Sequence, residues 1–264
     1  MALAQREFLK IKIEDRVAIV TIDRPPVNAL NGKAMQELAE VFEELAQSPE
    51  VKVIVLTGEG KNNTFIAGAD VKEIGGLKSS KEAEEIAKKG QGILDKIEKM
   101  KKPVIAGINS VCLGGGNELA MACHIRIASD RARFGQPEIN LGIIPGFGGT
   151  QRLARLVGPS KARELILSGD MITAQEALRI GLVDRVVPDG ELLRQTLGLA
   201  KKIASKGAVA IAHAQEAIFE GLKTSLEEGL DREAKFFGKI AETEDMKEGI
   251  RAFLEKRQPK FQDK

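Results

Sequence analysis

A carboxylate near the middle of the chain directly follows a glycine-rich turn, where it could move a proton. The turn is Gly114-Gly115-Gly116, and Glu118 opens the run Glu118-Leu119-Ala120-Met121-Ala122, which favours a helix. Glycines let the backbone approach a ligand closely, and N–H groups at a helix start point toward negative charge. The stretch therefore combines donors for an anionic atom with one group for proton transfer.

A purely structural interpretation of this turn stays open on these residues alone, because Glu118 would favour the first turn of any helix. Two phosphate-binding motifs are excluded. Leu119 stands where the dinucleotide-binding fingerprint needs its third glycine, and no Gly-Lys-Ser or Gly-Lys-Thr occurs in the chain. Further stretches are needed to make the chemistry specific.

A second carboxylate and a second run of small residues supply such stretches. Glu138 follows Pro137 among apolar neighbours and is a candidate acid or base. The run Ala67-Gly68-Ala69 allows another close approach of backbone to ligand, and Asp70 can cap the segment after it. A plain loop is the alternative for this run.

The elements that position these residues are β-rich in the first half and helical afterwards. Residues 8–22 predict a hairpin that turns at 14–16, and Val53–Gly58 and Val104–Ile108 predict buried strands. The glycine-rich segment 145–149 is interpreted as a tight turn into a helix, with Thr150 or a nearby glycine as N-cap. Helical patterns dominate from 162 onward.

Composition narrows the functional classes. The chain has 264 residues with 40 basic and 38 acidic side chains spread along it, which does not predict a nucleic-acid footprint. Two cysteines and two histidines are too few for a disulfide framework or a zinc cluster, so we expect no metal. With neither an apolar leader nor a membrane-length apolar run, we expect a cytoplasmic protein without membrane contact.

These stretches together make the chain similar to the enoyl-CoA hydratase (crotonase) family along nearly its whole length. In motif it is closest to bacterial short-chain enoyl-CoA hydratases and 3-hydroxybutyryl-CoA dehydratases. The segments that carry the resemblance occur in family order and spacing: residues 66–73, 113–120, 134–138, 145–153 and the tail 247–257.

The resemblance implies an α/β fold, a crotonase-like spiral of ββα units with a C-terminal helical trimerisation region. We expect the α/β core to occupy residues 1–195 and the helical oligomerisation region residues 196–264. The family is typically a dimer of trimers, so a homo-hexamer is expected.

The resemblance also implies the reaction, the reversible syn addition of water to a trans-2-enoyl-CoA to give a 3-hydroxyacyl-CoA. The thioester carbonyl of the acyl-CoA substrate would lie between the N–H groups of Ala69 and Gly115. Such donors stabilise the enolate-like state that forms when water adds to the double bond. Glu118 would then hold and activate water, while Glu138 would supply the proton to C2.

Further positions match the family's contacts to coenzyme A, which is part of the substrate, so no separate cofactor is expected. Lys72 lies in the matching segment, and Phe253 and Lys256 would come from a neighbouring subunit. The matching positions around the acyl-CoA are Ile66, Ala67, Gly68, Asp70, Lys72, Gly114, Phe253 and Lys256.

Other activities of the same superfamily remain alternatives, chiefly enoyl-CoA isomerase and hydrolase. Several such relatives place an acidic residue near the third segment, whereas this chain has Gly146-Phe147-Gly148 and keeps Glu118 and Glu138. A non-catalytic RNA-binding homologue is a third alternative, which the balanced charge and the two glutamates disfavour. The residues do not specify the length of the acyl chain.

Overall fold

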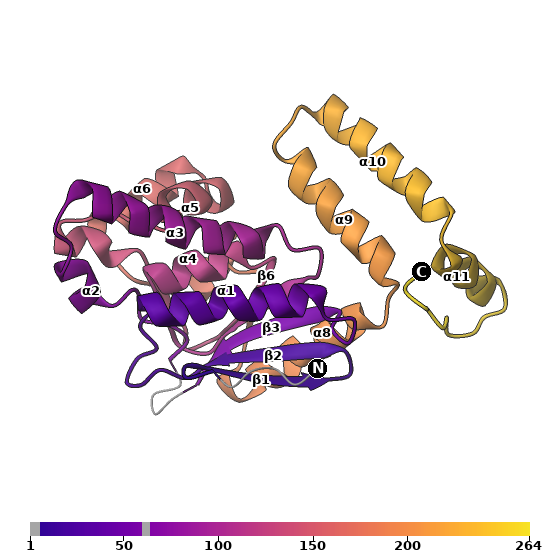
Figure 1. Cartoon of the computed structure of the whole chain (residues 1–264), viewed down its shortest axis with the longest axis horizontal. Helices are drawn as coiled ribbons and strands as arrows, with labels where there is room; N and C mark the ends of the chain where they lie inside the picture. The colour runs from indigo at the N-terminus through magenta and orange to yellow at the C-terminus, as the bar shows by residue number, and fades with distance from the viewer. Residues whose placement is uncertain (1–5, 60–63) are drawn as a thin grey trace.

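The computed structural model describes residues 6–59 and 64–264 and shows a six-stranded sheet in the order β1-β2-β3-β4-β6-β9 (Figure 1). β1 and β2 form the predicted antiparallel hairpin, with positive φ at Asp15 and Arg16, as a type I′ turn requires. All other neighbours in this sheet pair in parallel. The strands are Leu9–Glu14 (β1), Val17–Ile22 (β2), Val53–Gly58 (β3), Val104–Ile108 (β4), Ile125–Ser129 (β6) and Arg185–Val187 (β9).

Different helices cover the two faces of this sheet. Successive side chains of a strand point to opposite faces, so Ile54 and Leu56 pack in the larger core while Val53 and Val55 pack against α8. Burial on both faces explains why the parallel strands are continuous apolar runs in the sequence. The covering helices are α1 (Gly32–Gln47), α3 (Ser80–Glu98) and α8 (Leu192–Ala204).

A smaller sheet in the order β5-β7-β8 carries the chain from the large sheet to the site. The predicted ββα pattern is confirmed, because it occurs twice in succession. Each unit consists of a strand of the large sheet, a strand of the small sheet and a helix. The first unit is β4, β5 (Val111–Leu113) and α4 (Gly115–Ala122), and the second is β6, β7 (Arg133–Gly135) and the 3-10 helix η1 (Pro137–Leu141). The remaining core elements are α2 (Val71–Gly75), α5 (Gly149–Val157), α6 (Pro159–Ser168), β8 (Ile172–Thr173), α7 (Ala174–Arg179) and η2 (Asp189–Glu191).

Three C-terminal helices, here called the arm, extend away from this core (Figure 1). They are α9 (Ala208–Gly221), α10 (Leu226–Ala241) and α11 (Glu244–Leu254). The helical C-terminal region expected from the sequence is therefore present. The expected boundary at 195/196 falls inside α8, which packs on the sheet, and the division into two units stays a prediction.

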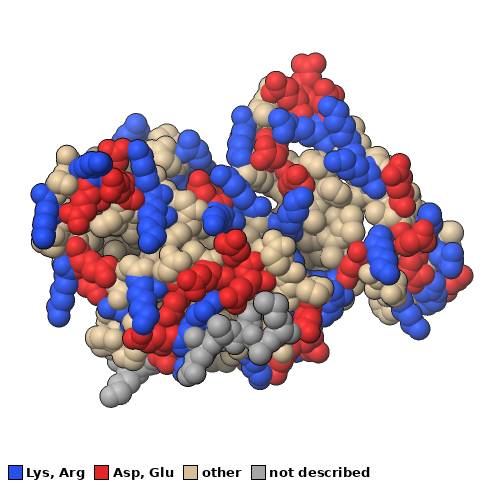
Figure 2. All heavy atoms as spheres, viewed as in Figure 1, with Lys and Arg blue, Asp and Glu red and all other residues tan. Residues whose placement is uncertain are grey.

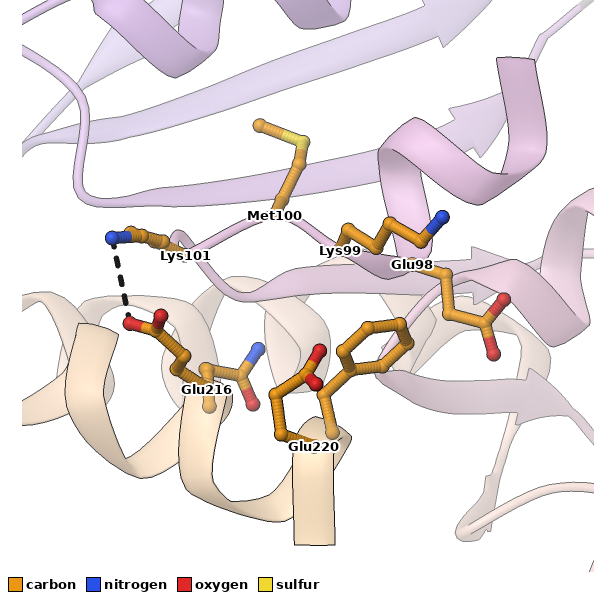
Figure 3. A pocket seen from close by; sticks show the side chains of 8 residues that line it. Glu98, Lys99, Met100, Lys101, Glu216 and Glu220 are labelled. Atoms are coloured by element: carbon orange, nitrogen blue, oxygen red, sulfur yellow. Dashed lines mark ion pairs between the residues drawn. The ribbon is translucent and has the colours of Figure 1, made fainter. Parts of the chain in front are cut away.

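The arm contacts the core at both of its ends. Lys101 Nζ, just after α3, lies 3.4 Å from Glu216 Oε2 of α9 at one end of a crevice, and Glu98 lines the other end of the same wall (Figure 3). The tail after α11 returns to the start of the arm, where Asp263 accepts a hydrogen bond from the Ala208 N–H (2.9 Å) and pairs with Lys52 Nζ (2.6 Å). Because Lys52 is nearly buried, this ion pair fixes the tail on the core.

The surface combines charges of both signs with uncharged areas on the arm. Basic and acidic side chains alternate over the face in Figure 2, while uncharged surface is exposed in the hollow of the arm. No helix within residues 6–59 and 64–264 is long and apolar enough to cross a membrane.

Candidate active site

Glu118 lies where the predicted glycine turn becomes a helix. α4 begins at Gly115, with Gly114 as its N-cap at φ 49°, a conformation that favours glycine. The Glu118 side chain is buried, with 2% of the residue exposed. Its Oε1 accepts hydrogen bonds from the backbone N–H groups of Phe147 (2.8 Å) and Gly149 (2.6 Å). Two donors on one oxygen orient the carboxylate and leave the other oxygen for a ligand.

Glycines make the loop that supplies these donors possible. Gly148 caps α5 at φ 109°, so the glycine alternative for the N-cap is confirmed over Thr150. A Cβ on Gly149 would lie 2.2 Å from Gln136 Nε2 and 3.0 Å from Glu118 Oε1. The interpretation of this segment as only a tight turn was incomplete, because the segment also positions Glu118.

Glu138 approaches the same turn from η1. A Cβ on Gly114 would lie 2.8 Å from Glu138 Oε1, so the missing side chain makes room for the carboxyl group. Glu138 Oε2 is buried and has no hydrogen-bond partner among the described residues. This oxygen is therefore free to bond to a ligand.

Burial controls the protonation of both carboxyl groups. Burial is the main reason that the pKa of Glu118 rises to about 7; the charge of Glu138 contributes to this rise, while the N–H groups of Gly149 and Phe147 oppose it. Burial also raises the pKa of Glu138 above its ordinary value. Near neutral pH the pair can therefore hold one proton between them.

Two backbone N–H groups meet beside these carboxyl groups. Leu30 bonds to the C=O of Gly68 and to the N–H of Asp70, so the N–H of Ala69 between them points away from Leu30. A Cβ on Gly115 would lie 3.4 Å from the Ala69 nitrogen. Neither the Ala69 nor the Gly115 N–H donates to a protein acceptor in the described part of the chain. Both are available to one ligand oxygen.

Close packing brings the two segments together. Ile66 pairs with Cys112 of β5, and a Cβ on Gly116 would lie only 2.5 Å from the Ile66 carbonyl oxygen. The third glycine of the turn is thus required by the approach of the segment that carries Ala69. The small residues Ala67 and Gly68, at φ 105°, continue this segment.

An apolar cavity opens beside the paired N–H groups. Its volume is about 150 Å³, and its lining extends from Ala69 to the α2 and α3 helices. Among the lining side chains are Leu30, Ile74, Leu77, Ile86, Ile93 and Phe147. Such a cavity suits an apolar chain attached to whatever oxygen the N–H groups bind.

The structure brings only some of the predicted coenzyme A residues to this site. Asp70 caps α2, as the sequence predicts, by accepting from the Lys72 N–H (3.1 Å). It also pairs with Arg24 (2.7 Å), which sequence reasoning missed and which holds the pKa of the Asp70 carboxyl below its usual range. Phe253 lies in α11 and Lys256 follows just after it, on the opposite side of the molecule from α2 in Figure 1. Within one chain they do not reach the site.

Paired N–H donors, two desolvated carboxyl groups and an apolar cavity define a class of enzyme that stabilises an oxyanion and moves protons next to it. The family model described as enoyl-CoA hydratase/isomerase matches residues 12–264. The chain therefore belongs to the enoyl-CoA hydratase/isomerase family, as its motifs predicted.

Individual relatives cover almost the whole chain. The probable enoyl-CoA hydratase of Bacillus subtilis is 46% identical over 254 residues, which are 96% of this chain and 98% of that protein. The crotonyl-CoA hydratase of Syntrophomonas wolfei is 45% identical over 256 residues (97% and 98%). Among solved structures, the enoyl-CoA hydratase from Bacillus anthracis superposes with a TM-score of 0.93 at 37% identity (98% and 100%). The crotonase-like fold predicted from the motifs is confirmed.

Proposed function

We propose that this chain is a cytoplasmic enoyl-CoA hydratase that adds water reversibly to a trans-2-enoyl-CoA. The observation that carries the proposal is the meeting of the Ala69 and Gly115 N–H groups beside Glu118 and Glu138. The names of the relatives from Bacillus subtilis and Syntrophomonas wolfei support the same reaction.

The thioester carbonyl oxygen accepts a hydrogen bond from each of the two N–H groups, and the acyl chain of the substrate enters the apolar cavity. Addition of water at C3 builds negative charge on that oxygen, and fixed donors stabilise this charge without reorganising. Loss of one donor of this kind raises a barrier by roughly 3 kcal/mol.

The two carboxyl groups divide the proton transfers. Glu118, oriented by Phe147 and Gly149, holds water through its free oxygen and removes a proton as the water attacks C3. Glu138, raised in pKa and without a donor on Oε2, delivers a proton to C2. Both groups adjoin the Gly114-Gly115 turn, so they act from one side of the double bond and the addition is syn. The reaction is redox-neutral and needs no cofactor, since coenzyme A enters as part of the substrate.

The arm completes the protein as an interface with further copies of the same chain. No residue of α9 or α10 is buried, and exposed apolar side chains lie on both helices and at the end of α9: Ile218, Leu222, Leu226, Leu230 and Phe237. Exposed apolar side chains gathered in one region are typical of a protein–protein interface. A homo-hexamer would cover it and could bring Phe253 and Lys256 to the coenzyme A of a neighbour.

The test is hydration of crotonyl-CoA, followed as loss of the enoyl-thioester absorbance. The wild type should consume the substrate, while Glu118→Gln and Glu138→Gln should each lower kcat by about 100- to 10,000-fold, the usual value of a general acid or base. Glu84→Gln, an exposed change on α3, is the matched control. A folded wild type that hydrates neither crotonyl-CoA nor longer enoyl-CoAs would refute the proposal and favour isomerase or hydrolase chemistry. Steeply salt-dependent RNA binding without turnover would favour the binding protein.

A further inference from the structure

The α3 helix contains a buried glycine that its local structure does not require. Gly90 lies near the middle of Ser80–Glu98, where glycine lowers helix stability relative to alanine. A Cβ on Gly90 would lie 2.3 Å from Cδ1 and 2.4 Å from Cε1 of Phe147. The aromatic ring therefore occupies the place of a side chain at position 90.

The other edge of the same ring lies near the start of α4. A Cβ on Gly115 would lie 3.6 Å from Cδ2 of Phe147, which is ordinary van der Waals distance. The ring thus lies between α3 and the turn that carries the Gly115 N–H. It also lines the apolar cavity, together with side chains such as Ile74 and Leu77.

Further contacts fasten the loop around Phe147 to α3. Gln91 donates from Nε2 to the carbonyl oxygen of Gly146 (2.9 Å). Arg152 donates to the carbonyl oxygen of Phe147 (2.9 Å) and pairs with Asp95 (2.6 Å) and Glu98 (2.8 Å) of α3. Since the Phe147 N–H holds Glu118, a shift of the ring would move a donor of the proposed base.

We propose that Gly90 is a positioning and specificity-determining residue, because its missing side chain seats the Phe147 ring. Through that ring α3 sets both the orientation of Glu118 and the depth of the acyl cavity. The ring restricts the cavity to short acyl chains. This inference rests on the proposed function, since it assigns the apolar cavity to the acyl group.

The chain offers a matched control two residues further along the same helix. A Cβ on Gly92 would meet no atom within 4 Å, so Gly92→Ala adds the same methyl group without touching the ring. Phe147→Ala removes the ring but keeps the backbone N–H that holds Glu118. In the double variant Gly90→Ala/Phe147→Ala, the new methyl group at position 90 enters space from which the Phe147 ring has been removed.

The first measurement is kcat and KM for crotonyl-CoA in these four variants and the wild type. Gly90→Ala should lower kcat at least tenfold with little change in KM, whereas Gly92→Ala should match the wild type. The double variant should recover most of the activity that Gly90→Ala loses, because the two changes are coupled through one contact. Equal behaviour of Gly90→Ala and Gly92→Ala, or additive losses in the double variant, would overturn the positioning role.

The second measurement does not depend on turnover. Calorimetric binding of butyryl-, hexanoyl-, octanoyl- and decanoyl-CoA, which cannot be hydrated, reports the depth of the cavity. Phe147→Ala should bind the longer acyl-CoAs at least tenfold more tightly relative to butyryl-CoA than the wild type does. An unchanged ratio would overturn the specificity role, even if Gly90→Ala failed to fold. A wild type that binds acyl-CoA with the expected ratios but hydrates none of the enoyl-CoAs would refute the hydratase proposal alone.

Discussion

The core and the arm of this chain differ in how far their apolar side chains are buried. In the core, β3 and β4 are almost completely enclosed, and even Glu118 is buried. In the arm, α9 and α10 have no buried residue, and Leu222 and Leu226 are 84% and 80% exposed. The core therefore buries its apolar surface within one chain, whereas the arm leaves apolar surface exposed, as is typical of an interaction site.

The comparison also separates two uses of glycine. In the core, glycines at 90, 114, 116 and 149 stand where a Cβ would meet another group within 3 Å. In the arm, a Cβ on Gly238 would meet nothing within 4 Å. Close packing around the site thus depends on absent side chains, and substitutions should affect the two regions very differently.

The largest expected effect is in the core, at the donor to Glu118. Gly149→Ala would force a methyl group against Gln136 and Glu118 and so move the N–H that donates to the carboxylate. We expect kcat on crotonyl-CoA to fall by about 1,000-fold, which corresponds to loss of one preorganised donor. Gly146→Ala in the same loop, where a Cβ has only Ala87 at 4.0 Å, is the control. Equal activity of the two variants would show that the tight packing does not position Glu118.

The second effect tests the arm. Replacing Leu222 and Leu226 together by Asp should dissociate the oligomer, because each buried leucine contributes roughly 1.5–3 kcal/mol. Light scattering after size-exclusion chromatography gives the mass. The same change at Leu167, which is 66% exposed on the core helix α6, should leave the mass of the wild type unchanged. If the mass of the double variant stays that of the wild type, the arm is not the interface.

A third effect follows from the buried carboxylate. The folded chain keeps a proton on Glu118 up to about pH 7, whereas the unfolded chain loses it near 4.5, so this group's contribution to stability falls as the pH rises from about 4.5 to 7. Glu118→Gln should therefore be more stable than the wild type at pH 8, with a free energy of unfolding higher by about 3 kcal/mol at most. This difference should close toward pH 4.5. Thermal melts at fixed protein concentration give this difference. A gap that is constant with pH would contradict the shifted pKa.

The smallest effect compares the same substitution in both regions. A Cβ on Gly198 of α8 and one on Gly238 of α10 both extend into open space. Alanine should stabilise either helix by roughly 0.5–1 kcal/mol. Thermal melts of the two variants should thus agree. Destabilisation by Gly238→Ala alone would indicate that a neighbouring subunit packs against that position.

Local patterns in the sequence predicted the elements well. The hairpin turn at Asp15-Arg16 was recognisable because it depends on a few adjacent residues. The strands β3 and β4 were recognisable from continuous apolar runs. The glycine turn before Glu118 was evident as well, although its chemistry needed other stretches to become specific.

Contacts between distant segments were not predictable in the same way. Glu118 receives its N–H donors from a loop 31 residues away at Gly149, and Asp70 pairs with Arg24, 46 residues away. No periodic pattern encodes either contact. Gly90 lies in a charged helix, where a glycine suggests only a weaker helix, so its role is visible only with the Phe147 ring in place.

The attachment of the arm at both ends has a consequence for assembly. Asp245 of α11 holds the tail through the N–H groups of Gln262 and Asp263, and Asp263 in turn joins Lys52 and the first residue of the arm. A segment joined by a single hinge would lose rotational freedom when subunits meet, and this loss would weaken association. Here the orientation is set when each chain folds. In the proposed hexamer, subunits would therefore dock without a separate step that orders the arm.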